Sequence, residues 1–255
     1  MSETTEQPLY GTVLLKAKQL IDVIAKSSEP LTLKQISDQV PISKPTVLKI
    51  LRTLIYCGFI RENAARKTYD LGTIFLEYGQ RVAASFDIKA STRPFLEQLR
   101  DETNETVNLG IVEDHRIVLL DKLESPRSVK LVSRIGGTMN MYSSAMGKAI
   151  LASYEPQDLQ TYLAHTSLKA LTPNTITDPE QLQLNLKTIQ KKGYAIDNIE
   201  NQPDIFCVGF DLIKHHHVYG AFSISAPEYR VNEQVFKGFI KYGLQTRQAI
   251  LASLS

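Results

Sequence analysis

The chain has 255 residues, of which 43% are hydrophobic and 22% charged. This composition is typical of a folded protein with one large or two average domains, and it excludes a disordered or collagen-like chain. Two distant cysteines and a polar N-terminal segment predict a reduced, cytoplasmic protein without a signal peptide. No apolar run is long enough to span a membrane, so no membrane partner is expected.

The charge is unevenly distributed, although the net charge is only +2. Residues 43–67 contain six Lys or Arg side chains, and Glu62 is their only acidic residue. Such a local excess is typical of a surface that contacts a polyanion. A solvated surface can carry the same excess, so the interpretation depends on the elements that display these charges.

Residues 13–58 predict three helices. Apolar residues recur at helical spacing over 13–26, and a second, short helix from Thr32 is broken by Pro41. Ser43 is the expected N-cap of the third helix, with Pro45 in its first turn. Gly58 ends this helix.

Two strands over 59–61 and 68–71 follow and form a predicted β-hairpin. Helix, short helix, helix and hairpin in this order predict a winged helix-turn-helix. Its third helix projects from the surface and fits the major groove of double-stranded DNA. A winged helix used only for protein contact is the alternative.

Cations and hydroxyl groups on the third helix and hairpin can reach phosphates and base edges, and the free N–H groups of a helix's first turn suit a phosphate. The candidate DNA-binding residues are Ser43, Lys44, Pro45, Thr46, Lys49, Arg52, Arg61, Arg66 and Lys67.

The next predicted helix, 74–86, interrupts its apolar residues only with Glu77 and Arg81. We expect this apolar stripe to be buried in a dimer, which would present two recognition helices about 34 Å apart.

The remaining chain predicts an α+β domain with an antiparallel sheet. The pattern indicates strands over 107–112, 117–123 and 129–134, and a closing hairpin over 206–213 and 218–226. It indicates helices over 88–103, 144–154, 156–165, 179–192 and 232–254.

Enzyme motifs are missing from the sequence. It has no G-x-S-x-G nucleophile turn, and Gly147-Lys148 lacks the rest of a phosphate-binding loop. The adjacent side chains of His215, His216 and His217 point in different directions in a predicted turn, so no metal site and no cofactor are expected. We therefore predict a non-enzyme, with a small-molecule hydrolase or a ligand sensor that does not bind DNA as alternatives.

Four segments together resemble the IclR family of transcriptional regulators. Residues 42–54, followed by 57–60 and 69–72, resemble the family's N-terminal domain. Three later segments resemble its second-half signatures: Ser144-Ala145-Met146-Gly147-Lys148-Ala149, Gly193-Tyr194-Ala195-Ile196-Asp197 with Glu200-Asn201, and Ser223-Ile224-Ser225-Ala226-Pro227. The similarity covers about residues 10–254 in the family's order.

The resemblance implies a winged helix-turn-helix over 10–72, a linker helix over 73–87 and a GAF-like effector-binding domain over 88–255. It implies a homodimer or homotetramer that binds operator DNA and regulates a metabolic operon, most often as a repressor. It also implies an effector that is a small molecule, commonly an organic acid.

The effector-binding positions implied by the resemblance are Leu131, Ala145, Met146, Asp197, Ile205, Cys207, Ser223 and Ser225. Ser223 and Ser225 are two residues apart on a predicted strand, so their hydroxyl groups face one side. Asp197 would repel a bare carboxylate unless the two groups share a proton. Met146 is bulky where many relatives have smaller residues.

Overall fold

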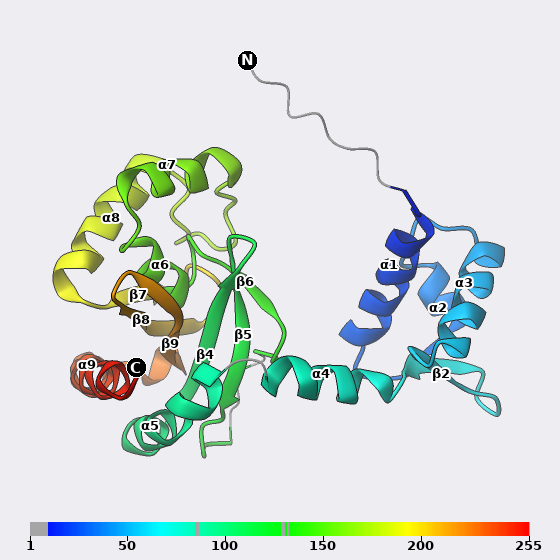
Figure 1. The fold of residues 1–255 in the computed structure, drawn as a ribbon, viewed down its shortest axis with the longest axis horizontal. Coiled ribbons are helices and arrows are strands. Elements are labelled where there is room, and N and C mark those ends of the chain that lie inside the picture. Colours follow the sequence, from blue (N-terminus) through cyan, green and yellow to red (C-terminus); the bar gives the residue numbers. More distant parts are fainter. Residues whose placement is uncertain (1–9, 85–86, 129–130, 132, 255) are drawn as a thin grey trace. The chain divides into compact units, whose positions relative to one another are not determined.

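The computed structural model describes residues 10–84, 87–128, 131 and 133–254. The chain divides into two compact units, Met1–Ser85 and Phe86–Ser255. Figure 1 shows the elements of both units. Within the described residues, none of the helices combines the length and the apolar character that a transmembrane span requires.

The first unit is a winged helix-turn-helix, as the sequence predicted. Its elements are α1 (Val13–Lys26), β1 (Leu31–Thr32), α2 (Leu33–Ser37), α3 (Lys44–Tyr56), β2 (Ile60–Asn63), β3 (Thr68–Leu71) and α4 (Ile74–Ala84). The strands form an antiparallel sheet in the order β1-β3-β2. The sequence did not predict β1, which is two residues long and exists through its pairing with β3.

Apolar side chains from each element hold this unit together. Leu20 of α1, Ile36 of α2, and Val47 and Leu51 of α3 are fully buried in one cluster. Each such side chain stabilises the fold by about 1.5–3 kcal/mol relative to exposure. The predicted N-cap Thr32 is confirmed, because its side chain accepts a hydrogen bond from the backbone of Gln35 in a capping box.

The second unit is an antiparallel sheet with helices on both faces. Its elements are α5 (Asp87–Thr103), β4 (Thr106–Glu113), β5 (Arg116–Leu123), β6 (Thr138–Asn140), α6 (Ala145–Leu151), α7 (Pro156–His165), α8 (Pro179–Lys192), β7 (Ala195–Asn198), β8 (Ile205–Lys214), β9 (His217–Pro227), the 3-10 turn Glu228–Arg230 and α9 (Glu233–Ser253). The sheet order is β6-β5-β4-β9-β8-β7. Helices α5 and α9 lie against one face of the sheet, and α6, α7 and α8 cover the other (Figure 1).

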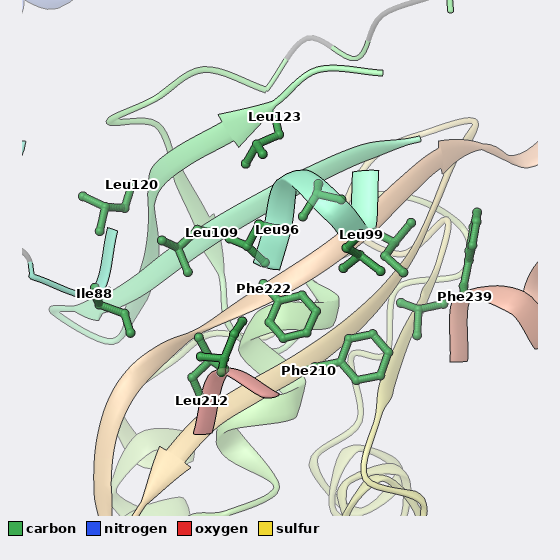
Figure 2. Close-up of a cluster of buried hydrophobic side chains, with 14 of the residues drawn as sticks. Ile88, Leu96, Leu99, Leu109, Leu120, Leu123, Phe210, Leu212, Phe222 and Phe239 are labelled. Carbon is green, nitrogen blue, oxygen red and sulfur yellow. The ribbon is translucent and has the colours of Figure 1, made fainter. Parts of the chain in front are cut away.

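Alternation along the strands separates the two faces of the sheet. Phe210 of β8 and Phe222 of β9 point toward α5 and α9, and their rings stack with centroids 5.1 Å apart (Figure 2). The neighbouring residues Gly209, Ala221 and Ser223 therefore face α6. One face is filled with large apolar side chains, and the other accommodates both a helix and polar groups.

The strand predicted over 129–134 is wrong for the residues that the structure describes there. Residues 131, 133 and 134 are not in a strand, and 129, 130 and 132 lie outside the described residues. The carbonyl oxygen of Leu131 accepts a hydrogen bond from Lys122 Nζ at 2.7 Å instead of a sheet partner. The sheet edge beside β5 is formed by β6, which pairs with it from Arg116 to Val118.

Two predicted helices differ in length from the observed ones. The helix predicted over 144–154 ends at Leu151, where residues 152–154 form a turn. The helix predicted over 74–86 is described as far as Ala84, and its last two residues lie outside the described ones.

Candidate functional site

Helix α3 separates apolar from cationic side chains. Its buried face consists of Val47, Ile50, Leu51 and Leu54. Lys44, Lys49 and Arg52 are exposed, because helical spacing places them away from that core. The charged groups on the exposed face of α3 are therefore all positive.

The start of α3 differs from the prediction in one detail. Ser43 is the N-cap residue, but its side chain makes no hydrogen bond to the backbone of the first turn. Its hydroxyl group lies 2.9 Å from the hydroxyl of Thr46. The first-turn N–H groups thus receive no side-chain cap from Ser43, and Pro45 occupies a position where a missing N–H group costs little.

The β2–β3 hairpin carries the remaining candidate cations, all exposed. Arg61 Nη2 lies 2.6 Å from Asp70 Oδ2, and this hydrogen bond to Arg61 lowers the pKa of Asp70. Arg66 donates its backbone N–H to Asn63 Oδ1 at 3.1 Å, and Lys67 has a positive φ of 52°. The turn presents Arg66 and Lys67 to solvent, while Arg61 is held against an acidic neighbour.

The second unit contains a cavity of about 50 Å³ on the α6 side of the sheet. All eight residues that the family resemblance implied line it: Leu131, Ala145, Met146, Asp197, Ile205, Cys207, Ser223 and Ser225. The structure adds six residues that the sequence reasoning did not single out: Asn108, Ser133, Met139, Ser144, Asn201 and Gln202. We call this the effector cavity.

Strand register brings distant residues to this cavity. Cys207 of β8 pairs with Ser225 of β9 on one side and with Asp197 of β7 on the other. Asn108 of β4 pairs with Ser223. Residues paired across antiparallel strands point to the same face, so Asp197, Cys207 and Ser225 form one polar row, and Ser223 and Asn108 lie in the next row of that face. The place of Asn108 at the cavity follows from this register, so the sequence alone did not indicate it.

Helix α6 begins in direct contact with the sheet at Gly209. A Cβ atom on Gly209 would lie 2.4 Å from the carbonyl carbon of Ala145, so no larger residue fits at this position. The predicted start of α6 is confirmed, because the Ser144 side chain accepts a hydrogen bond from the Gly147 N–H at 3.2 Å. The N–H groups of Ala145 and Met146 belong to the first turn, where no helical carbonyl precedes them.

The polar wall of the cavity is a chain of hydrogen bonds. Asn108 Nδ2 donates to Ser225 Oγ at 3.1 Å, and Ser133 Oγ donates to Asn108 Oδ1 at 3.3 Å. The hydroxyl oxygens of Ser223 and Ser225 are 3.4 Å apart. These groups are oriented before any ligand enters, which reduces the ordering cost of binding.

Asp197 is the carboxylate of the cavity. Its Oδ1 accepts hydrogen bonds from the backbone N–H groups of Glu200, at 2.7 Å, and Asn201, at 3.1 Å. Burial nevertheless raises the pKa of Asp197 to about 7, because it penalises the charged form more than these donors stabilise it. Burial also raises the pKa of the neighbouring Cys207 thiol. At neutral pH the cavity therefore holds a carboxyl group that can share a proton and a thiol that stays neutral.

Among the described residues, no three His, Cys, Asp or Glu side chains are grouped in a way that could hold a metal ion. His215 and His216 both have positive φ at the tip of the β8–β9 hairpin, a backbone conformation of a tight turn. The polar groups that the structure does bring together are suited to binding a small polar molecule.

Comparison with known proteins identifies both units. Residues 13–64 match the model of the IclR helix-turn-helix domain, and residues 80–251 match that of the bacterial transcriptional regulator IclR C-terminal domain. The chain is 32% identical over 257 residues to the DNA-binding transcriptional repressor YiaJ of Escherichia coli, covering 98% of this chain and 90% of that protein.

Solved structures agree with these matches. The Thermotoga maritima IclR structure superposes with a TM-score of 0.79 at 32% identity, covering 96% of this chain and 99% of that one. An IclR homolog from Microbacterium hydrocarbonoxydans, complexed with 4-hydroxybenzoate, shares the fold with a TM-score of 0.75 at 17% identity, covering 94% and 99%. The chain therefore belongs to the IclR family of bacterial transcriptional regulators.

Proposed function

We propose that this regulator represses a metabolic operon by binding operator DNA through residues 10–72, and that a small organic acid in residues 88–255 controls this binding. Residues 73–87 are the proposed linker helix. The observation that carries the proposal is the cationic face of α3 on a helix-turn-helix unit. Among the described residues that line the effector cavity, Asp197 is the only carboxylate, and backbone N–H groups hold it.

The proposed DNA interface combines α3 with the hairpin. The exposed cations Lys44, Lys49 and Arg52 would enter the major groove, where Thr46 is close enough to the helix start to reach a base edge or a phosphate. Arg66 and Lys67 would contact the adjacent phosphates. Arg61 would have to exchange its ion pair with Asp70 for one with DNA.

The proposed effector is a small organic acid that shares a proton with Asp197. The hydroxyl groups of Ser223 and Ser225 and the amide of Asn108 can donate to the carboxylate of such a ligand. With its raised pKa, Asp197 adds no full negative charge at neutral pH, so a carboxylate ligand is not repelled.

The proposed active form is a homodimer, in line with the two-fold symmetry of operator DNA. The first unit exposes apolar side chains that a second copy could cover. Leu76 and Tyr78 of α4 are 69% and 45% exposed, and Leu14 of α1 is 71% exposed. Exposed apolar side chains of this size can take part in protein interfaces.

The double variant Ser223→Ala/Ser225→Ala tests the proposed coupling of the two units. It should still bind operator DNA, measured by fluorescence anisotropy, but DNA binding should no longer respond to organic acids that release the parent protein. Coupling is reciprocal, so such an acid must also bind the DNA complex more weakly than the free protein. Loss of DNA binding in the correctly folded double variant would contradict the assignment of these serines to the effector site.

A further inference from the structure

The effector cavity is small for a binding site. Its volume is about 50 Å³. Sites for larger organic ligands measure about 300–1,000 Å³. A ligand that fits without rearrangement therefore has only a few non-hydrogen atoms.

Met146 is one of the apolar side chains that line the cavity. It starts on α6 and reaches across to β4, where its Sδ atom lies 3.3 Å from the position that a Cβ atom on Gly110 would take. The side chain is 2% exposed and packs into the cluster that contains Ile117 and Met141. It is therefore both a core residue and a wall of the cavity.

The backbone behind Met146 is packed closely against β8. The backbone atoms of Ala145 and Met146 are in contact with Gly209, where a Cβ atom would lie 2.4–2.7 Å from them. Protein interiors are packed as densely as organic crystals, so a ligand that needs more space must displace side chains. The length of the side chain at position 146 is then the property that determines how much space the ligand has.

The remaining walls divide into two chemical classes. Asn108, Ser223, Ser225 and Asp197 offer hydrogen bonds, whereas Leu131, Met139, Met146 and Ile205 are apolar. A ligand that matches both the polar and the apolar walls carries a carboxylate and a short apolar chain. A hydroxyl or oxo group next to the carboxylate can form a hydrogen bond with Asp197.

We propose that Met146 sets an upper limit on the size of the effector, so that this chain selects short-chain hydroxy or oxo carboxylic acids over long-chain and aromatic acids. The proposal rests on the proposed effector function and names the ligand class of the same site. A shorter side chain at position 146 should relax the selection.

The test compares the affinities of four acids for the full chain by isothermal titration calorimetry. Glycolate and lactate are the short acids, and 2-hydroxyhexanoate and 4-hydroxybenzoate are the large ones. The parent protein should bind a short acid at least tenfold more tightly than either large acid. Met146→Ala should reduce this ratio at least tenfold, and Met146→Leu, which keeps most of the volume, should preserve it.

Met141→Ala is the matched control. Met141 is fully buried in the same cluster but does not line the cavity, so its truncation disturbs the core without enlarging the site. Met141→Ala should therefore keep the parent's ratio of affinities for short and large acids. If Met146→Ala does not give a folded protein by near-ultraviolet circular dichroism, Met146→Val provides the same comparison with a smaller truncation.

Equal affinity of the parent for short and large acids would overturn the size limit, as would an unchanged ratio in a folded Met146→Ala or Met146→Val protein. In both cases a short acid still binds, so the proposed effector function stands. Failure of all four acids to bind any variant is a different result, which contradicts the proposed effector class and the size limit together.

Discussion

The Nζ atom of Lys148 lies 2.5 Å and 2.6 Å from the two carboxylate oxygens of Glu200, and neither side chain is appreciably exposed. The ion pair joins α6 to the turn after β7. Through its backbone N–H group, Glu200 also donates to Asp197 at 2.7 Å. The pair therefore supports the turn that holds the carboxyl group of the effector cavity.

Removal of one partner of this pair should be strongly destabilising, because it leaves a buried charge without compensation. We expect Lys148→Met or Glu200→Gln to lower the free energy of unfolding by about 3–5 kcal/mol. The double variant Lys148→Met/Glu200→Gln should lose less than the sum of the single variants. Thermal and urea denaturation of the full chain measure both effects.

The exposed pair of Lys237 and Glu233 on α9 is the control for that experiment, with side chains 71% and 80% exposed. Lys237→Met should change the stability by about 0–1 kcal/mol, as is usual for surface ion pairs. A similarly small effect of Lys148→Met would show that the buried pair does not support the turn.

The raised pKa of Asp197 makes stability depend on pH. In the unfolded chain its pKa is about 3.9, and in the folded protein it is about 7. The native state thus retains a proton that the unfolded state has lost between these values. The resulting stabilisation is complete below about pH 4 and is lost as the pH rises through 7, on the order of a few kcal/mol.

Asp197→Asn should lose this dependence, since the amide oxygen can still accept from Glu200 and Asn201 but has no proton to release. The melting temperature of the parent relative to Asp197→Asn should fall between about pH 4 and pH 7. Asp101→Asn, at a side chain that is 65% exposed, serves as the control and should follow the parent. Parallel curves for the parent and Asp197→Asn would rule out the raised pKa.

The exposed cations of α3 should determine how strongly DNA binding depends on salt. Each phosphate contact releases about one counterion, so Lys49→Ala or Arg52→Ala should reduce the slope of log affinity against log salt by about 1. Thr46→Ala should cost about 1–3 kcal/mol at a specific site if the hydroxyl contacts a base. Lys237→Ala changes the net charge equally and should leave the slope unchanged, which separates local contacts from overall charge.

The ion pair between Arg61 and Asp70 predicts a gain in DNA affinity. Asp70→Asn removes a negative charge from the hairpin and frees Arg61 for a phosphate, so non-specific DNA affinity should rise severalfold at low salt and less at high salt. Combining Arg61→Ala with Asp70→Asn should abolish this gain in DNA affinity. If Asp70→Asn weakens DNA binding in a folded protein, the pair positions the hairpin and does not compete with DNA.

The apolar surface of α4 predicts the oligomeric state. Leu76→Lys places a charge at a side chain that is 69% exposed in the single chain. Light scattering at micromolar concentration should show a dimer for the parent and a larger monomer fraction for the variant. Leu184→Lys on α8, at a side chain that is 56% exposed, is the control. A monomeric parent protein, or a dimer unaffected by Leu76→Lys, would contradict the proposed interface.

The sequence by itself determined the elements whose signals are local. The helical spacing of α1, α3 and α8, the cap at Thr32, and the β2–β3 hairpin all follow from residues within one or two turns of each other. These signals were sufficient for the winged helix-turn-helix and its cationic face. The family resemblance then supplied the positions around the effector cavity, which no periodicity reveals.

The tertiary structure decided what depends on distant partners. The strands β1, β6 and β7 contain two to four residues, too few for a recognisable period, and they exist because β3, β5 and β8 offer them hydrogen bonds. The place of Asn108 beside Ser225 and the burial of Lys148 against Glu200 depend on sheet register and on the contact of α6 with Gly209. A pair of residues far apart in sequence carries no local signal, because only the folded chain brings them within reach.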